Sequence, residues 1–174
     1  MIILKIKTVV LIIIAVIIII LAKNKNDNIV IPKESIRIRI IANSNDEVDI
    51  IEKLKVKKSV EQELYSLLKN ANNVNDARSI INNNLERLNL VIEDTTKLKY
   101  DVKFGNNYFP KKVYKGVIYD SGDYESIVIT LGNGIGENWW CVLFPPLCLL
   151  DENDNTKDVE YKFFAKELID KYIK

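Results

Sequence analysis

The chain has 174 residues, enough for one domain of ordinary size and too few for two substantial ones. Its 25 basic and 24 acidic residues balance, which argues against nucleic acid as a partner. No histidine is present, which removes the usual serine and cysteine triads and most catalytic zinc sites. We therefore expect neither a metal nor a cofactor.

The first 22 residues are typical of an export signal or a membrane anchor. After two lysines, residues 8–22 are uncharged and nearly all aliphatic. Such a helix is about 22 Å long and needs its preceding residues to reach the ~30 Å of a hydrocarbon core. Ala22 is the one small residue at the cleavage position, so a cleaved signal peptide and a signal-anchor both stay open. Residues 23–34 are predicted to be a polar tether, and residues 35–174 a single extracytoplasmic domain.

The domain is predicted to begin with a half-buried strand. Residues 35–42 alternate isoleucine with polar residues, among them Arg37 and Arg39, which is the period of a strand with one buried face. Asn43 and Ser44 then open a turn rich in helix-capping residues, so a helix is expected to follow directly.

Two helices are predicted next, the first from this turn to about residue 70 and the second over residues 75–90. The second carries an apolar stripe at helical spacing. The residues of the first helix that we expect in the core are Val48, Ile51, Leu54, Val60, Leu64, Leu67 and Leu68.

The second half changes to the period of strands and ends in a helix at about residues 159–173. The predicted strands and their connecting turns cover residues 97–104, 105–107, 112–119, 120–123 and 124–131. The resulting order is β-α-α-β-β-β-α after an N-terminal apolar helix. Because the later connections are short, we predict an α+β fold with an antiparallel sheet of about four strands covered by helices.

Both tryptophans and both cysteines fall within residues 138–148. In an oxidising exterior, Cys141 and Cys148 could form a disulfide, worth about 2–3 kcal/mol in the chain-entropy model. Two buried thiols are the alternative.

The aromatic residues of this segment have two interpretations. Trp139, Trp140 and Phe144 could be core residues. Alternatively, they form an exposed ridge, stiffened by Pro145 and Pro146, that docks on a partner, because tryptophan is enriched in binding hot spots. The interpretations are compatible if one tryptophan is buried and the other exposed.

Three segments together resemble a known family, the stage II sporulation protein R family. They are residues 36–44, residues 111–132 and, most specifically, residues 134–148 with their tryptophans, cysteines and prolines. The resemblance spans roughly residues 36–151, with the apolar N-terminus in the expected place.

This resemblance implies an exported intercellular signalling protein of endospore formation. Such a protein crosses from the forespore into the space between the two cells. It activates a membrane-embedded aspartic protease, which processes the precursor of the early mother-cell sigma factor. The expected partners are then the extracytoplasmic face of that protease and, through residues 1–22, a membrane, with no small-molecule substrate. The candidate contact residues are Trp139, Trp140, Phe144, Pro145, Pro146, Arg37, Arg39, Asn43 and Ser44.

On this interpretation the chain is a ligand and not an enzyme, whether secreted or tethered to the membrane. Asp120-Ser121-Gly122 has the letters of an aspartic protease motif, but a single copy in a tyrosine-rich turn is more typical of a hairpin. The alternative is an extracytoplasmic hydrolase that uses carboxylates on the cell wall, which requires two facing carboxylates in a deep pocket. A structural component of an envelope complex is a third hypothesis.

Overall fold

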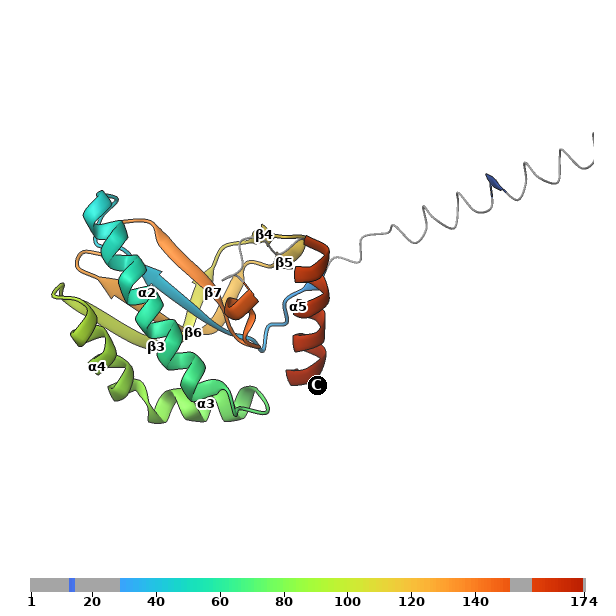
Figure 1. The fold of residues 1–174 in the computed structure, drawn as a ribbon, viewed down its shortest axis with the longest axis horizontal. Coiled ribbons are helices and arrows are strands. Elements are labelled where there is room, and N and C mark those ends of the chain that lie inside the picture. The colour runs from blue at the N-terminus through green and yellow to red at the C-terminus, as the bar shows by residue number, and fades with distance from the viewer. Residues whose placement is uncertain (1–12, 15–28, 151–157, 174) are drawn as a thin grey trace, which may run out of the picture.

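The computed structural model describes residues 13–14, 29–150 and 158–173 (Figure 1). The predicted signal segment, residues 1–22, lies outside the described residues except for 13–14, as does the first part of the tether. Within the described ranges, no helix is both long and apolar enough to cross a membrane.

The described elements form the predicted α+β fold. Two strands are followed by three α-helices, five further strands, a short 3₁₀ helix and a last α-helix. In chain order they are β1 (Ile29–Val30), β2 (Ile36–Ile41), α2 (Glu47–Leu68), α3 (Val74–Asn83), α4 (Leu85–Thr95), β3 (Tyr100–Phe109), β4 (Lys112–Tyr114), β5 (Val117–Tyr119), β6 (Gly122–Leu131), β7 (Asn138–Phe144), the 3₁₀ helix η1 (Leu147–Leu150) and α5 (Asp158–Tyr172). The strand β2 and the long helix α2 agree with the sequence analysis.

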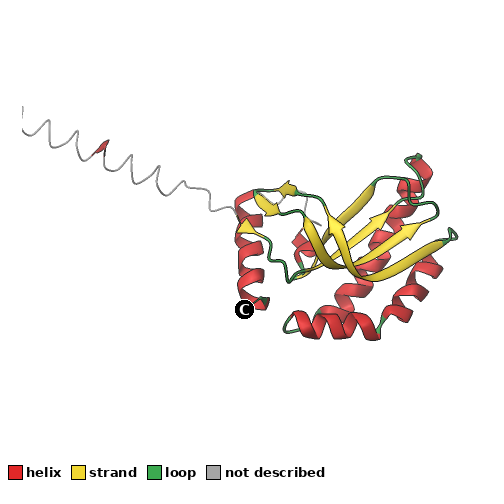
Figure 2. Ribbon diagram, turned by 180° about the vertical axis from the view of Figure 1, so that it is seen from behind, coloured by secondary structure: helices red, strands yellow, loops and turns green. Residues whose placement is uncertain are grey.

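The main sheet is mixed, so the prediction of an antiparallel sheet is wrong. Its order is β3-β6-β2-β7, with β2 antiparallel to β7 but parallel to β6. Parallel neighbours need a long crossover, and α2, α3 and α4 all lie between β2 and the later strands. These helices cover one face of the sheet, while the view from behind shows strands in front of them (Figures 1 and 2).

A second, smaller sheet has the order β1-β5-β4 and was not predicted. Strand β1 pairs in parallel with β5, and Ile31 after it is buried. The part of the domain that the structure describes therefore begins with a strand at Ile29, within the predicted tether. The small sheet, Val142 of β7 and helix α5 enclose a second apolar cluster, which includes Tyr119 and Leu147.

Two predicted connections differ from the structure. The turn predicted at residues 105–107 is part of β3, which pairs with β6 without interruption from Tyr100 to Phe109. Asn107 Nδ2 donates to Ser126 Oγ at 3.0 Å, so an asparagine typical of turns is used between strands. Conversely, the strand predicted at residues 112–119 is the hairpin β4–β5, turning at Lys115 and Gly116. Both turn residues have positive φ, as a two-residue hairpin turn requires.

The helical segment predicted at residues 75–90 is two helices, α3 and α4, separated at Asn84. Asn84 Nδ2 donates to Ile80 O at 2.8 Å. Such a local side-chain bond to the backbone competes with continued helix. The predicted apolar stripe itself is confirmed, since Ala77, Ile81 and Leu88 are buried.

The prediction for helix α2 is right for its second half and wrong for its first. Val60, Leu64 and Leu68 are buried, as expected. The stripe that contains them continues toward the N-terminus through Val56 and Lys53, because residues three or four apart share a helix face. The three predicted core residues nearest the start of the helix lie off this stripe and are exposed: Val48, Ile51 and Leu54.

Candidate functional site

The antiparallel pair β2–β7 brings together the two sequence motifs that lie about a hundred residues apart. Arg39 lies opposite Trp140, and Ile41 lies opposite Asn138. Asn43 and Ser44 directly follow β2, beside the loop of residues 132–137 that leads into β7. The candidate contact residues therefore lie along the β2–β7 pair and at its two ends.

The two tryptophans point to opposite faces of the sheet, as successive residues of a strand must. Trp139 packs against the core under the helices, with Lys57 Nζ 4.8 Å from its ring centroid. Trp140 lies on the other face, with ring centroids 5.4 Å from Phe109 and 5.7 Å from Tyr119. Both tryptophans are half-buried, so each ring packs inside the domain and also keeps an exposed part.

Arg37 is fully buried in a cage of aromatic rings. Its guanidinium carbon lies 3.3 Å from the ring centroid of Tyr124, 5.2 Å from that of Phe109 and 5.4 Å from that of Trp140. The Tyr124 hydroxyl donates to Asp120 O at 3.0 Å, and the Arg37 guanidinium lies over the face of the Tyr124 ring. Such contacts contribute about 0.5–2 kcal/mol each.

Burial lowers the pKa of the Arg37 guanidinium, and the neighbouring Tyr124 opposes that shift. Arg39 is less buried, and burial likewise lowers its pKa. Its guanidinium carbon lies 4.2 Å from the Phe109 centroid, and Nη2 donates to Tyr108 O. The structure thus uses both arginines to pack β2 against its neighbours.

Asn43 and Ser44 are held in a hydrogen-bond network. Asn43 Oδ1 accepts from Asn133 N at 2.8 Å, while its Nδ2 donates to Asp49 Oδ2 at 2.7 Å. Ser44 Oγ donates to the same carboxylate oxygen at 2.6 Å. These donors, first Ser44 and then Asn43, lower the pKa of Asp49. Asn45 Oδ1 accepts from Glu137 N at 2.6 Å, which fixes the end of the loop.

The glycines of this loop allow the close approach that the network needs. A Cβ on Gly136 would lie 2.1 Å from Ser44 O, which is far inside any real contact. At Gly132 the φ of 55° also favours glycine, and a Cβ there would lie 2.1 Å from Asn43 Oδ1. The glycines therefore allow the loop to pack directly against the turn after β2. Their spacing does not fit a nucleotide-binding loop.

The other end of the motif is packed inside the domain. Phe144 and Pro145, joined by a cis peptide bond, are buried, and Pro146 is half-buried. Cys141 and Cys148 are also buried, and their Sγ atoms lie 3.6 and 3.0 Å from the same oxygen, Val142 O. A disulfide between them stays a prediction.

A largely apolar groove of about 610 Å³ lies beside this buried end. Its lining residues come from β2, the second half of α2, β7, η1 and α5, and they include Leu64, Leu68, Phe144, Pro146 and Tyr172. Glu61 is the one carboxylate among them, so the groove does not hold the facing pair that the hydrolase hypothesis requires. Within the described residues there is also no group of three or more side chains suited to hold a metal ion.

Comparison with known proteins decides the family. The family model of stage II sporulation protein R matches residues 32–154. The chain belongs to the stage II sporulation protein R family. Stage II sporulation protein R of Bacillus subtilis strain 168 is 37% identical to it over 152 residues, covering 83% of this chain and 68% of that protein. No solved structure matches the chain.

The match to stage II sporulation protein R includes the whole β2–β7 pair, the loop network and the aromatic cage, whereas α5 lies outside it. Several residues that build this region were not predicted as site residues, namely Asn45, Asp49, Tyr124 and Phe109. The capping residues after β2 were a usable signal for the first two. No spacing or composition indicated that Phe109 and Tyr124 enclose Arg37.

Proposed function

We propose that the protein is an exported intercellular signal of sporulation that activates a membrane-embedded aspartic protease. That protease then processes the precursor of the early mother-cell sigma factor. The observation that carries the proposal is membership of the stage II sporulation protein R family, which supports a role in sporulation.

The site favours a ligand over an enzyme. The chain has no histidine, and the groove offers a single carboxylate. The polar residues after β2 form hydrogen bonds that fix the loop before β7. A surface that is rigid before binding loses less entropy when a partner binds. If the protein hydrolyses cell wall instead, the purified protein will release soluble fragments from isolated peptidoglycan.

The proposal is tested with the full chain in sporulating cells and with a protein that begins at Lys23. We expect deletion of the gene to abolish processing of the sigma-factor precursor, and the exported chain to restore it. The purified protein should bind the extracytoplasmic face of the protease in detergent or membranes. Normal processing without the protein, together with no binding, would exclude this function.

The tryptophans remain candidate contacts, and the structure changes how they must be tested. If the rings contact the partner, Trp139→Ala and Trp140→Ala should abolish signalling without unfolding the domain. Because each ring also packs against an apolar cluster, thermal unfolding must be measured beside processing. Loss of processing in a variant that stays folded supports contact with the partner, and unfolding of both variants assigns the rings to packing.

A further inference from the structure

Four exposed aliphatic side chains lie at the start of α2 and in the loop before β7. Val48, Ile51 and Leu54, three residues apart on α2, are 73%, 45% and 50% exposed. Ile135, between two glycines of the loop, is 74% exposed. We call these four residues the tip patch. Soluble proteins expose few such groups together unless the surface binds something.

The loop holds Ile135 outward by hydrogen bonds on both sides. Ile135 N donates to Asn43 O at 3.2 Å, and Gly136 N donates to Ala42 O at 3.1 Å. Asn43 is itself fixed to Asp49 in the first turn of α2. The side chain is therefore presented by a rigid backbone, which reduces the entropy lost when a partner binds.

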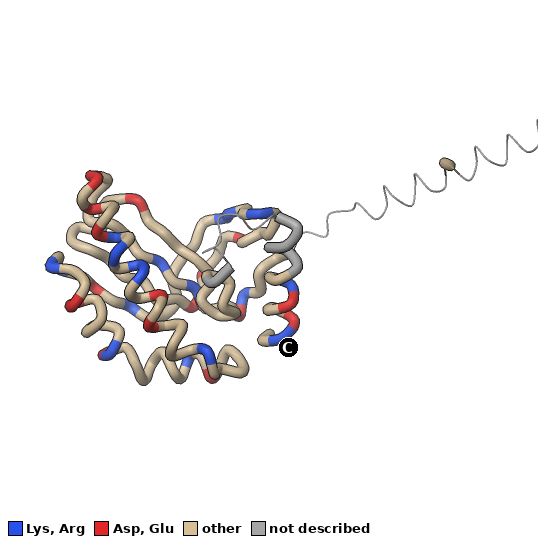
Figure 3. The backbone as a smooth tube through the Cα atoms, viewed as in Figure 1, with Lys and Arg blue, Asp and Glu red and all other residues tan. Residues whose placement is uncertain are grey.

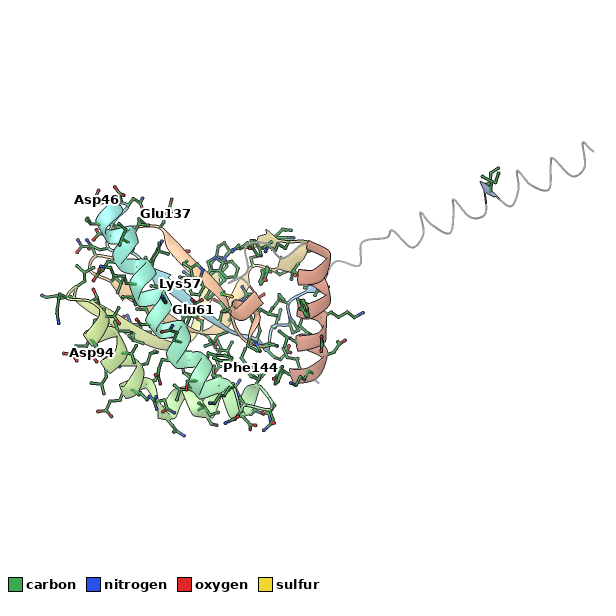
Figure 4. All side chains as sticks on the ribbon, in the orientation of Figure 1. Asp46, Lys57, Glu61, Asp94, Glu137 and Phe144 are labelled. Carbon is green, nitrogen blue, oxygen red and sulfur yellow. The ribbon has the colours of Figure 1, made fainter. Side chains whose placement is uncertain are left out.

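The tip patch lies at the end of the domain away from the N-terminal strand. Asp46 lies two residues before Val48, and Glu137 lies two residues after Ile135. Both lie at the start of α2 (Figure 4). Helix α5 and the hairpin β4–β5 lie at the opposite end (Figure 1). Because β1 pairs with β5, the chain enters the domain at that opposite end. A protein attached to a membrane through its N-terminus would therefore direct the tip patch away from that membrane.

The rim of the patch beside Val48 and Ile135 is acidic, whereas lysines border its other part beside Leu54. Asp46, Glu47 and Glu137 are exposed and form no ion pair within the described part of the chain. Figure 3 shows acidic positions at the start of α2, followed by basic positions along the helix. Two of the neighbouring lysines have partners: Lys53 Nζ donates to Glu137 O at 3.1 Å, and Lys55 is paired with Glu52 at 3.1 Å. Unpaired carboxylates around an apolar surface favour a partner with the opposite charge.

We propose that the tip patch is the surface that docks on the protease, against an extracytoplasmic segment with apolar residues flanked by lysine or arginine. The identity of the partner rests on the proposed function. The acidic rim beside Val48 and Ile135 selects this occupant over two others. A second copy across a two-fold axis would bring the same carboxylates together, and an anionic lipid surface would repel them.

The first test is Ile135→Asp in the full chain, assayed by processing of the sigma-factor precursor and by co-purification with the protease. Its control is Leu90→Asp, a leucine on α4 that is 57% exposed and lies outside the patch. We expect processing to fall about tenfold or more for Ile135→Asp and to stay normal for the control. Val48→Asp is a second variant, because the first turn of a helix tolerates an acidic residue well.

The second test reverses charge at matched positions. Glu47 and Glu86 both lie in the first turn of a helix, so Glu47→Lys and Glu86→Lys perturb their helices alike. We expect weaker co-purification with the protease for Glu47→Lys and normal co-purification for Glu86→Lys. The difference between wild type and Glu47→Lys should shrink at high salt, because salt screens exposed charges.

The outcomes separate this inference from the function itself. If the wild-type chain does not activate the protease, the proposed function fails. If it does, and Ile135→Asp and Val48→Asp activate equally well, the tip patch is not the docking surface. A dimer of the purified protein that Ile135→Asp dissociates, or binding to phosphatidylglycerol vesicles that Ile135→Asp abolishes, also overturns the inference.

Discussion

The two ends of the segment from Gly134 to Cys148 have opposite environments. Ile135 at the first end is 74% exposed, whereas Phe144 and Cys148 at the second end are 1% and 6% exposed. In Figure 4, Glu137 and Phe144 mark the two ends of β7. One continuous, highly specific run of sequence therefore combines a presented surface with a part of the core.

Different interactions hold the two ends. The exposed end is fixed by hydrogen bonds to the turn after β2, for example from Glu137 N to Asn45 Oδ1. The buried end is held by apolar packing, such as the edge-to-face contact of Phe144 with Tyr172 at 5.0 Å between ring centroids. Substitutions at the first end should therefore affect recognition, and those at the second end should affect stability.

Phe144→Ala should have the largest effect on stability. Removing a fully buried phenylalanine costs about 3–5 kcal/mol of the free energy of unfolding. Ile135→Ala is the matched variant at the exposed end, and it should stay within about 0.5 kcal/mol of wild type. Urea denaturation followed by tryptophan fluorescence measures both values. Equal losses in the two variants would contradict the division of the segment.

Reduction of a disulfide between Cys141 and Cys148 should have the next largest effect on stability, also at the buried end. If Cys141 and Cys148 are bridged in the exported protein, its mass is lower by two hydrogen atoms than that of the reduced chain. Reduction should then lower the free energy of unfolding by about 2–3 kcal/mol. An exported protein that shows the mass of two thiols would refute the bridge.

The sequence was sufficient to predict the elements that carry a clear period. The alternation around Arg37 and Arg39 predicted β2, and the pattern of capping residues predicted the start of α2. The stripe on α3 and α4 was also right, although Asn84 divides it into two helices. The specific run of residues 134–148 predicted the family, which the comparisons confirm.

The remaining features depend on contacts between distant residues. Strand period does not record direction, so the parallel pairing of β2 with β6 had no signal. The asparagines of residues 105–107 are typical of turns, yet Asn107 bonds to Ser126 on the neighbouring strand. Val48 was assigned to the core because apolar spacing alone does not say which side of a helix meets the sheet.

Gly136→Ala should lower the free energy of unfolding by about 1–3 kcal/mol. The new Cβ would lie 2.1 Å from the backbone oxygen of Ser44, which cannot rotate away. Gly105→Ala is the control, since a Cβ at Gly105 meets nothing within 4 Å. Thermal unfolding compares the two variants. A Gly136 variant as stable as the Gly105 variant would show that the loop is not locked to the turn.

Ser44→Ala should have the smallest effect, and its signature is in the pH dependence of stability. The pKa of Asp49 is lowered in the folded protein, mainly by the Ser44 hydroxyl. Its stabilising contribution is therefore present above the pKa of the unfolded chain and is lost as the pH falls through the folded pKa. The difference between wild type and Ser44→Ala should accordingly be larger at neutral pH than in acid.

The control for this measurement is Ser66→Ala, an exposed serine on α2 whose removal should give no such pH dependence. Part of the Ser44 effect does not depend on pH, because its Oγ also accepts from Asp46 N at 3.0 Å. Titration of the Asp49 carboxyl by NMR separates the two parts. A pKa of Asp49 that is the same in wild type and Ser44→Ala would mean that the hydroxyl does not hold the carboxylate, and that the loop before β7 depends on Asn43 and the glycines instead.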